Sequence, residues 1–330
     1  MISKIYKAAF IFLIIAAIGV LSSCGRSAST ASEVKTVKLD YAYYNPVSLV
    51  LKEKKWLEDE LKKDGIEVEW VFSAGSNKAL ELLNSKSIDF GSTAGSAALL
   101  GKANGNPIKS IYVYSKPEWT ALVARAGSPI EKVKDLKGKK IAVTRGTDPY
   151  IFLLRALDTE GLSEKDVEIV QLQHPDGKTA LEKGDVDAWA GLDPYIAQTE
   201  IEKHSKLFFR NADWNTYGFL NVREAFAKDH PEIVEKVLKA YEKARKWAIE
   251  NPDEFAKIVA AESKQSEEVT AKVLSRTDLT NPVIGEAHKQ TIEAAGEILL
   301  KSGVIDKSVD IKKTIDDLID PQYIKHINKD

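Results

Sequence analysis

Short apolar strands alternating with short helices constrain the fold of this chain more than any other feature. Residues 36–42 alternate polar and apolar side chains, as a half-buried strand does, and helical apolar spacing follows over residues 47–63. Further strands are predicted at 68–72, 88–91 and 108–115, with helices at 77–84 and 96–103 between them. Because strands separated by helices form parallel βαβ units, the sequence predicts an α/β fold.

The same pattern restarts after residue 136, which indicates a second lobe. Strands are predicted at 141–144, 167–172, 186–191 and 206–209, and helices at 150–160, 179–183 and 195–204. From Glu224 onward the chain is nearly all helical, with Pro231 and Pro252 each expected in a first helical turn. We expect one lobe from residues 36–118 with 219–330, another from 119–218, and two crossing segments near 117–123 and 217–221.

The charge of the chain excludes some partners. Its 47 Lys and Arg residues nearly balance its 49 Asp and Glu residues, for a formal net charge of -2. Proteins that bind nucleic acid have a basic stripe, so we expect no nucleic-acid partner. A balanced charge also produces no long-range field for an anion, so any anion site must be local.

The N-terminus reads as an export signal. Lys4 and Lys7 precede the apolar residues 8–20, which form a core of signal-peptide length and are too short to span a bilayer. Residues 21–24 (LSSC) then resemble a bacterial lipobox, which implies cleavage before Cys24 and acyl chains on its thiol. An uncleaved signal anchor, or a secreted form with an incidental cysteine, remains the alternative.

We therefore predict a signal peptide at 1–23 and a flexible tether at 24–35, because small polar residues such as these bury too little surface to fold. The protein is expected on the extracytoplasmic face of the cell membrane, held by a lipid anchor on Cys24. Since Cys24 is the single cysteine, no intramolecular disulfide and no cysteine metal cluster can form.

Three motifs occur in an order that resembles that of a known protein family. Residues 89–96 (DFGSTAGS), 136–147 (LKGKKIAVTRGT) and 184–195 (GDVDAWAGLDPY) resemble segments of the solute-binding proteins of ABC importers for aliphatic sulfonates, taurine and nitrate. The resemblance spans about residues 36–325. It implies a two-lobed periplasmic-binding-protein fold of type II, a monomer that closes on a small anionic solute and delivers it to a permease and its ATPase. The chain departs from the family at Asp148, where sulfonate binders often have small hydroxyl residues.

Two strand-to-helix turns are the candidate anion site. A sulfonate has three charged oxygens, and helix N-termini offer free N–H groups at the carboxyl ends of strands. The candidates are Ser92, Thr93, Gly95 and Ser96 in the first turn, and Arg145, Gly146, Thr147 and Asp148 in the second. The alternative is that the hydroxyl and acidic residues only cap helices; for Asp148, followed by Pro149, we expect an N-cap.

Further candidates lie in loops or are aromatic. Tyr44 and Asn45 follow the first strand, and either lines the cleft or forms a simple turn. Trp189 and Trp214 are candidates to pack on an aliphatic tail, although a tryptophan in a strand is usually core. Asp193 either caps a helix or receives an ammonium group, as a taurine-like zwitterion would require.

The sequence gives little support to catalysis. The five histidines are not spaced as metal ligands are. The sequence also has no nucleophile motif or phosphate-binding loop in the strand-to-helix setting that such motifs require. We therefore expect no metal, no cofactor and no enzymatic activity. Three alternatives stay open: a receptor for nitrate, taurine or a pyrimidine precursor, a surface scaffold lipoprotein, and an enzyme of the same fold.

Overall fold

The structure, a computed structural model, describes residues 34–327. The predicted signal peptide and Cys24 lie outside the described residues. From Lys35 onward the chain belongs to one compact unit. None of the described helices is both long enough and apolar enough to span a bilayer.

The first sheet has the strand order β11-β4-β10-β3-β1-β2. Its strands are β1 (Thr36–Tyr41), β2 (Glu67–Phe72), β3 (Phe90–Ala94), β4 (Ile108–Pro117), β10 (Gly218–Arg223) and β11 (Thr277–Asp278). β1 pairs in parallel with β2 and β3, which confirms the predicted parallel units. β10 runs antiparallel to both β3 and β4, so the sheet is mixed.

The second sheet has the strand order β7-β6-β8-β5-β9. Its strands are β5 (Thr120–Ala124), β6 (Lys140–Val143), β7 (Glu168–Gln171), β8 (Ala188–Leu192) and β9 (Lys206–Phe209). β6 lies parallel to β7 and β8, whereas β5 pairs antiparallel with β8 and β9. β10 and β5, which run antiparallel to their neighbours, lie next to the segments that run from one sheet to the other, and the short β11 also pairs antiparallel with β4.

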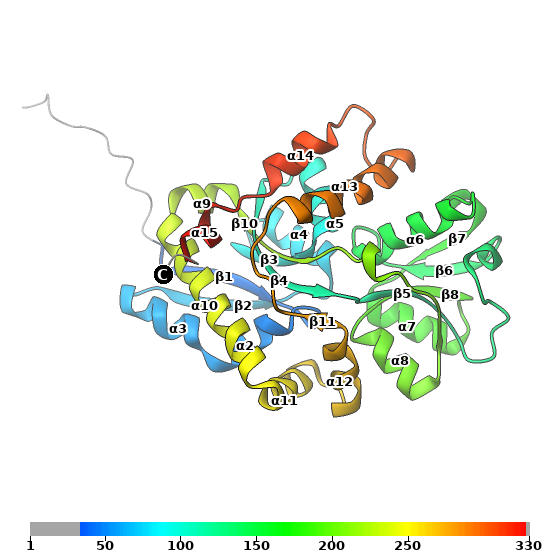
Figure 1. Ribbon diagram of the computed structural model, residues 1–330, viewed down its shortest axis with the longest axis horizontal. Coiled ribbons are helices and arrows are strands. Elements are labelled where there is room, and N and C mark those ends of the chain that lie inside the picture. Colours follow the sequence, from blue (N-terminus) through cyan, green and yellow to red (C-terminus); the bar gives the residue numbers. More distant parts are fainter. Residues whose placement is uncertain (1–33, 328–330) are drawn as a thin grey trace, which may run out of the picture. The chain divides into compact units, whose positions relative to one another are not determined.

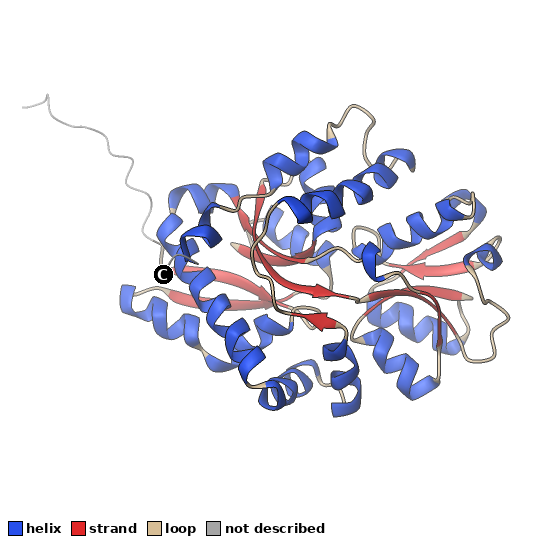
Figure 2. Cartoon of the chain, viewed as in Figure 1, coloured by secondary structure: helices blue, strands red, loops and turns tan. Residues whose placement is uncertain are grey.

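Helices cover both faces of each sheet (Figure 1, Figure 2). Those of the first sheet are α2 (Pro46–Lys54), α3 (Trp56–Leu61), α4 (Ser76–Asn84), α5 (Gly95–Ala103), α9 (Glu224–Asp229), α10 (Pro231–Glu250), α11 (Pro252–Ser263), α13 (Glu286–Lys301), α14 (Ile311–Leu318) and α15 (Gln322–Ile327). Those of the second are α6 (Asp148–Thr159), α7 (His174–Lys183) and α8 (Tyr195–Lys203), and α12 (Glu267–Ser275) packs on α8. We call each sheet with its helices a lobe.

Local backbone features explain where the helices begin and end. The helix predicted over 47–63 is two helices, because Lys55 adopts a left-handed conformation with φ 55° between α2 and α3. Pro231 and Pro252 open α10 and α11, as predicted, since proline lacks the N–H that a first turn leaves free.

The strands of the two sheets come from separate stretches of the chain, and the predicted lobe boundaries stay a prediction. Strands of the first lobe come from residues 36–117 and 218–278, and those of the second from 120–209. The chain passes between the sheets at residues 118–119 and 210–217. Whether these lobes move as separate bodies stays a prediction.

Candidate functional site

The turn predicted over residues 92–96 is mostly strand, because β3 continues to Ala94 and α5 begins at Gly95. A buried carboxylate holds the middle of β3. Asp40 accepts hydrogen bonds from the Ser92 amide and hydroxyl, both at 2.8 Å, and from the Ser73 hydroxyl at 2.6 Å. Asn45 donates to the Ser92 hydroxyl at 2.8 Å, and the Tyr44 hydroxyl donates to the Ser92 carbonyl at 2.8 Å. Burial raises the pKa of Asp40 to about 6, although these hydrogen bonds act in the opposite direction. Tyr44, Asn45 and Ser92 thus lie together and fix each other. Their role as ligand contacts stays a prediction.

A second buried carboxylate, that of Asp148, joins the two lobes. It accepts from the Ser96 hydroxyl at 2.5 Å, the Trp119 indole N–H at 2.8 Å, and the Thr216 amide and hydroxyl at 3.1 and 2.8 Å. Trp119 and Thr216 belong to the two segments that cross between the sheets. Burial raises the pKa of Asp148, and its four hydrogen bonds lower it.

The N-cap prediction for Asp148 is wrong. Thr147 occupies the N-cap position of α6, and Asp148 is the first helical residue. Its side chain therefore turns away from its own helix and receives donors from α5 and the crossing segments. A pattern of Asp followed by Pro does not distinguish these positions, because both residues are favoured within the first turn.

Thr93, Gly95 and Thr147 in these segments are buried, and both hydroxyls have partners within the protein. The Thr93 hydroxyl accepts from Asn221 at 2.8 Å, and the Thr147 hydroxyl donates to the Thr144 carbonyl at 2.6 Å. Gly95 packs so closely on α13 that a Cβ atom would lie 2.7 Å from Ile292. These contacts place the turns but do not test whether they bind a solute.

Three helix N-termini meet across the lobes beside Asn77. A Cβ atom on Gly146, before α6, would lie 3.5 Å from the Asn77 Cβ atom in α4. A Cβ atom on Gly75, before α4, would lie 3.1 Å from Nε2 of His174, the first residue of α7. None of the three helices has a side-chain hydrogen bond at its N-cap, so first-turn N–H groups stay available there, fewer in α6 and α7, where Pro149 and Pro175 have none.

The contact between α4 and α7 has no counterpart among the residues predicted from the sequence. His174 is fully buried, and burial lowers its pKa to about 3, so the imidazole is neutral. The signal in the sequence is His174 followed by Pro175 directly after a strand, the same strand-to-helix position as Thr147 and Asp148. Trp119 and Thr216 have no such signal, because their partners are distant in sequence.

Three predicted site residues lie away from this contact. Arg145 forms an ion pair with Glu164 at 2.7 Å and is partly exposed. Trp189 has no exposed surface and belongs to the core of the second lobe. Trp214 packs edge-on against Phe152 with a centroid distance of 5.7 Å. Their assignment as ligand contacts remains untested.

Asp193 lies at a third contact between the lobes. Its carboxylate accepts from the Ala197 amide at 3.0 Å, in a capping arrangement, and pairs with Arg276 at 3.4 Å. Arg276 also pairs with Glu200 in α8. Burial raises the pKa of Asp193 to about 6 against the opposing effect of Arg276. Asp193 thus has a partner cation within the protein.

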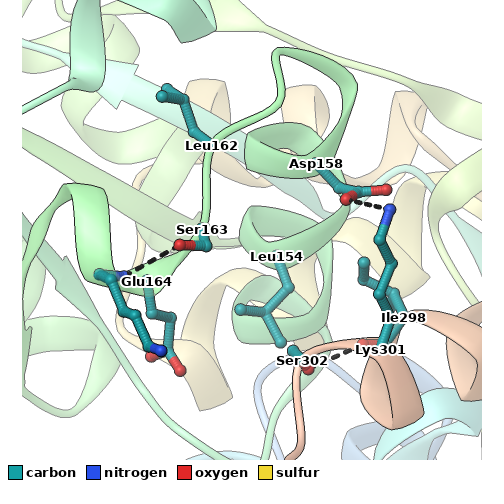
Figure 3. A pocket seen from close by; sticks show the side chains of 9 residues that line it. Leu154, Asp158, Leu162, Ser163, Glu164, Ile298, Lys301 and Ser302 are labelled. Carbon is teal, nitrogen blue, oxygen red and sulfur yellow. Dashed lines mark hydrogen bonds and ion pairs between the residues drawn. The ribbon is translucent and has the colours of Figure 1, made fainter.

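Two cavities lie where the lobes meet. One of about 10 Å³, roughly the space of one water, is lined by Tyr43, Tyr44, Pro46, Pro117, Glu118, Trp119, Asp193, Val273, Arg276 and Thr277. The other, of about 350 Å³, lies between α6 and α13 (Figure 3). Its rim includes the 2.6 Å ion pair of Asp158 with Lys301, and no predicted site residue lines it.

Comparisons with known proteins give one family and relatives that match all or part of the chain. The family model described as NMT1/THI5 like matches residues 48–255. A putative aliphatic sulfonates-binding protein of Bacillus subtilis is 31% identical over 320 residues, covering 96% of this chain and 95% of the relative. A taurine-binding periplasmic protein of Escherichia coli is 31% identical over 206 residues, covering 59% and 62% of the two chains.

Among solved structures, the alkanesulfonate-binding protein SsuA of Xanthomonas axonopodis pv. citri, bound to MOPS, has a TM-score of 0.77. Its identity to this chain is 22%, and the match covers 86% of this chain and 98% of that one. This likeness establishes a shared periplasmic-binding-protein fold, as the motif resemblance implies.

Proposed function

Because this chain belongs to the NMT1/THI5-like family, we propose that it is the solute-binding component of an ABC importer. Its solute is a small organic anion, with an aliphatic sulfonate first among the candidates. The relative that spans nearly the whole chain is named for sulfonate binding, which supports this choice.

The main observation in support of the proposal is that the N-termini of α4, α6 and α7 lie close together. Their N-termini come from different lobes, and each presents N–H groups without a side-chain cap. Aligned peptide dipoles add a positive partial charge at each end. A sulfonate stays ionised and spreads its charge over three oxygens, so several uncharged donors can hold it without a cationic side chain.

The two-lobed arrangement gives this site a mechanism. A solute that contacts both lobes binds the closed form better than the open one, and so shifts the population toward closure. Asp148 accepts hydrogen bonds from Ser96 and from Trp119 and Thr216 of the crossing segments, and these bonds hold the lobes together there. The closed form is then the one presented to the permease and its ATPase.

A lipid anchor on Cys24 is proposed to hold the protein at the membrane. The motif at residues 21–24 and the apolar segment before it support cleavage and acylation, which would hold a monomer at the extracytoplasmic face. Substitution Cys24→Ser should move the protein from the membrane fraction to the soluble fraction, while Ser27→Ala, in the predicted tether, should not.

Thermal unfolding with candidate anions tests the proposal. At one hundred times Kd, a ligand that binds only the folded protein adds about 2.7 kcal/mol to the free energy of unfolding. Ethanesulfonate, taurine, nitrate and thiamine precursors are the ligands to compare. A shift with nitrate or a precursor alone would replace the sulfonate, and no shift with any anion would reject the proposal.

A further inference from the structure

His174 presents an unpaired hydrogen-bond acceptor where the lobes meet. Its Nδ1 atom lies 3.3 Å from the Thr144 hydroxyl oxygen, and that hydroxyl donates to the Leu172 carbonyl at 2.7 Å. A hydroxyl has one proton, which Leu172 already receives, so Nδ1 must donate to Thr144. In the neutral ring Nε2 then has a lone pair and no proton.

Two further acceptors accompany it. Nε2 of His174, Oδ1 of Asn77 and Oε1 of Gln173 are all buried, and none has a hydrogen-bond partner within residues 34–327. Two of these atoms converge on Gly75, where a Cβ atom would lie 2.9 Å from Oδ1 of Asn77 and 3.1 Å from Nε2 of His174. Gln173 is the N-cap residue of α7 and lies directly beside His174. Buried acceptors without a donor are costly, so something outside this part of the chain should supply one.

A sulfonate group cannot satisfy them, because its three oxygens are themselves acceptors. An ammonium group is also a poor match, since the N-termini of α4 and α7 have positive partial charge. Two lysines on these helices already have partners: Lys78 pairs with Glu81 on α4, and Lys178 with Glu182 on α7. A hydroxyl donates a hydrogen bond without adding positive charge.

We propose that His174, Asn77 and Gln173 form an accepting subsite that selects a solute with a neutral donor beside its anionic head, a hydroxyalkanesulfonate. This proposal rests on the function proposed above. The anionic head faces the N–H groups of the helix ends, and the hydroxyl of the solute donates to His174 and Asn77.

Four probes of nearly equal length separate the possible causes of selectivity. Calorimetric titration of the purified full-length protein in detergent would compare 2-hydroxyethanesulfonate, ethanesulfonate, 2-methoxyethanesulfonate and taurine. The methoxy compound keeps the oxygen and loses the donor, and taurine keeps donors and adds a positive charge. We expect the hydroxy compound to bind about fivefold to a hundredfold more tightly than the ethane and methoxy compounds.

Variants assign the preference to His174. His174→Asn keeps a donor near the Nδ1 position and removes the Nε2 acceptor, so the preference for the hydroxyl should disappear. His174→Gln, which places an amide near the Nε2 position, should restore part of it. His326→Asn, at an exposed residue of α15, is the matched control. If the His174 variants fail to fold, Asn77→Ala tests the same subsite from the other lobe.

The outcomes are distinguishable. Equal affinity for all four sulfonates, or tightest binding of taurine, would overturn the subsite and leave sulfonate binding intact. If none of the four binds, the proposed function fails first, and the inference fails with it. A hydroxyl preference that survives both His174→Asn and Asn77→Ala would also overturn the assignment.

Discussion

The hydroxyl of Ser96 donates a 2.5 Å hydrogen bond to the carboxylate of Asp148, and this bond links the first turns of α5 and α6 across the two lobes. Both side chains are buried. A buried carboxylate is stable only when donors surround it, so each donor around Asp148 matters more than a surface hydrogen bond would.

Ser96→Ala should therefore destabilise the protein. Removing one donor from a buried charged group costs about 1.5–3 kcal/mol in the free energy of unfolding, measurable by urea denaturation. Ser85→Ala is the matched control, because that exposed hydroxyl contacts only the Leu82 carbonyl at 3.1 Å and the exposed Ser87 hydroxyl at 2.9 Å. Equal stability of the two variants would contradict the role of Asp148 as a link between lobes.

Asp40 should make the protein less stable as the pH rises from about 4 to about 6. Its folded pKa of about 6 exceeds the ordinary value of 3.8, so the folded protein holds a proton that the unfolded chain has lost. This difference in proton binding lowers the free energy of unfolding by about 2–3 kcal/mol over that interval, with no further change above it. Asp193 should lower the stability in the same direction, because its folded pKa is also raised to about 6. Urea unfolding of Asp40→Asn at several pH values should show a smaller decline, and an unchanged pH profile would refute this.

His174 should make the protein more stable as the pH rises, the opposite of the effect of Asp40. Its folded pKa of about 3 lies below the ordinary 6.5, so the unfolded chain binds the extra proton between these values. Stability from this residue is complete above about pH 6.5 and declines toward pH 3, by about 2 kcal/mol between pH 6.5 and pH 5. In His174→Gln this acid-side loss should be absent. A variant with the same loss as the native protein would show that the residue does not titrate on unfolding.

Gly75→Ala should impair closure of the lobes more than folding. The added Cβ atom would lie 2.9 Å from Asn77 and 3.1 Å from His174, too close for carbon, so α4 could not approach α7 as it does. We expect sulfonate affinity to fall by about tenfold, the equivalent of 1.4 kcal/mol. Gly285→Ala, where a Cβ atom would meet nothing within 4 Å, is the control and should bind normally.

The alternating pattern was enough to predict the α/β class and most strands, because a buried parallel strand has a distinct apolar run between turns. It could not show the break at Lys55, since a single left-handed residue inside a helical apolar pattern leaves the spacing unchanged. It also could not show that β10 pairs antiparallel between β3 and β4, because that pairing joins segments far apart in the chain.

The candidate site was predictable only where it follows strand ends. Tyr44 and Asn45 were predicted from a local turn, and Ser92, predicted in a turn, lies inside β3 beside them. Trp119, Thr216 and the Gly75–His174 contact depend on how the lobes meet, which no local pattern encodes. Arg145 shows the converse: the turn was predicted, but the direction of the side chain toward Glu164 was not.

A crystal structure of the protein with 2-bromoethanesulfonate would test the central claim most directly, because anomalous scattering locates bromine without assumptions about the fold. We predict the bromine between the lobes, with the sulfonate oxygens on the N–H groups of α4, α6 and α7. Bromine only in the cavity between α6 and α13, or no bound bromine at saturating concentration, would contradict the account (Figure 3).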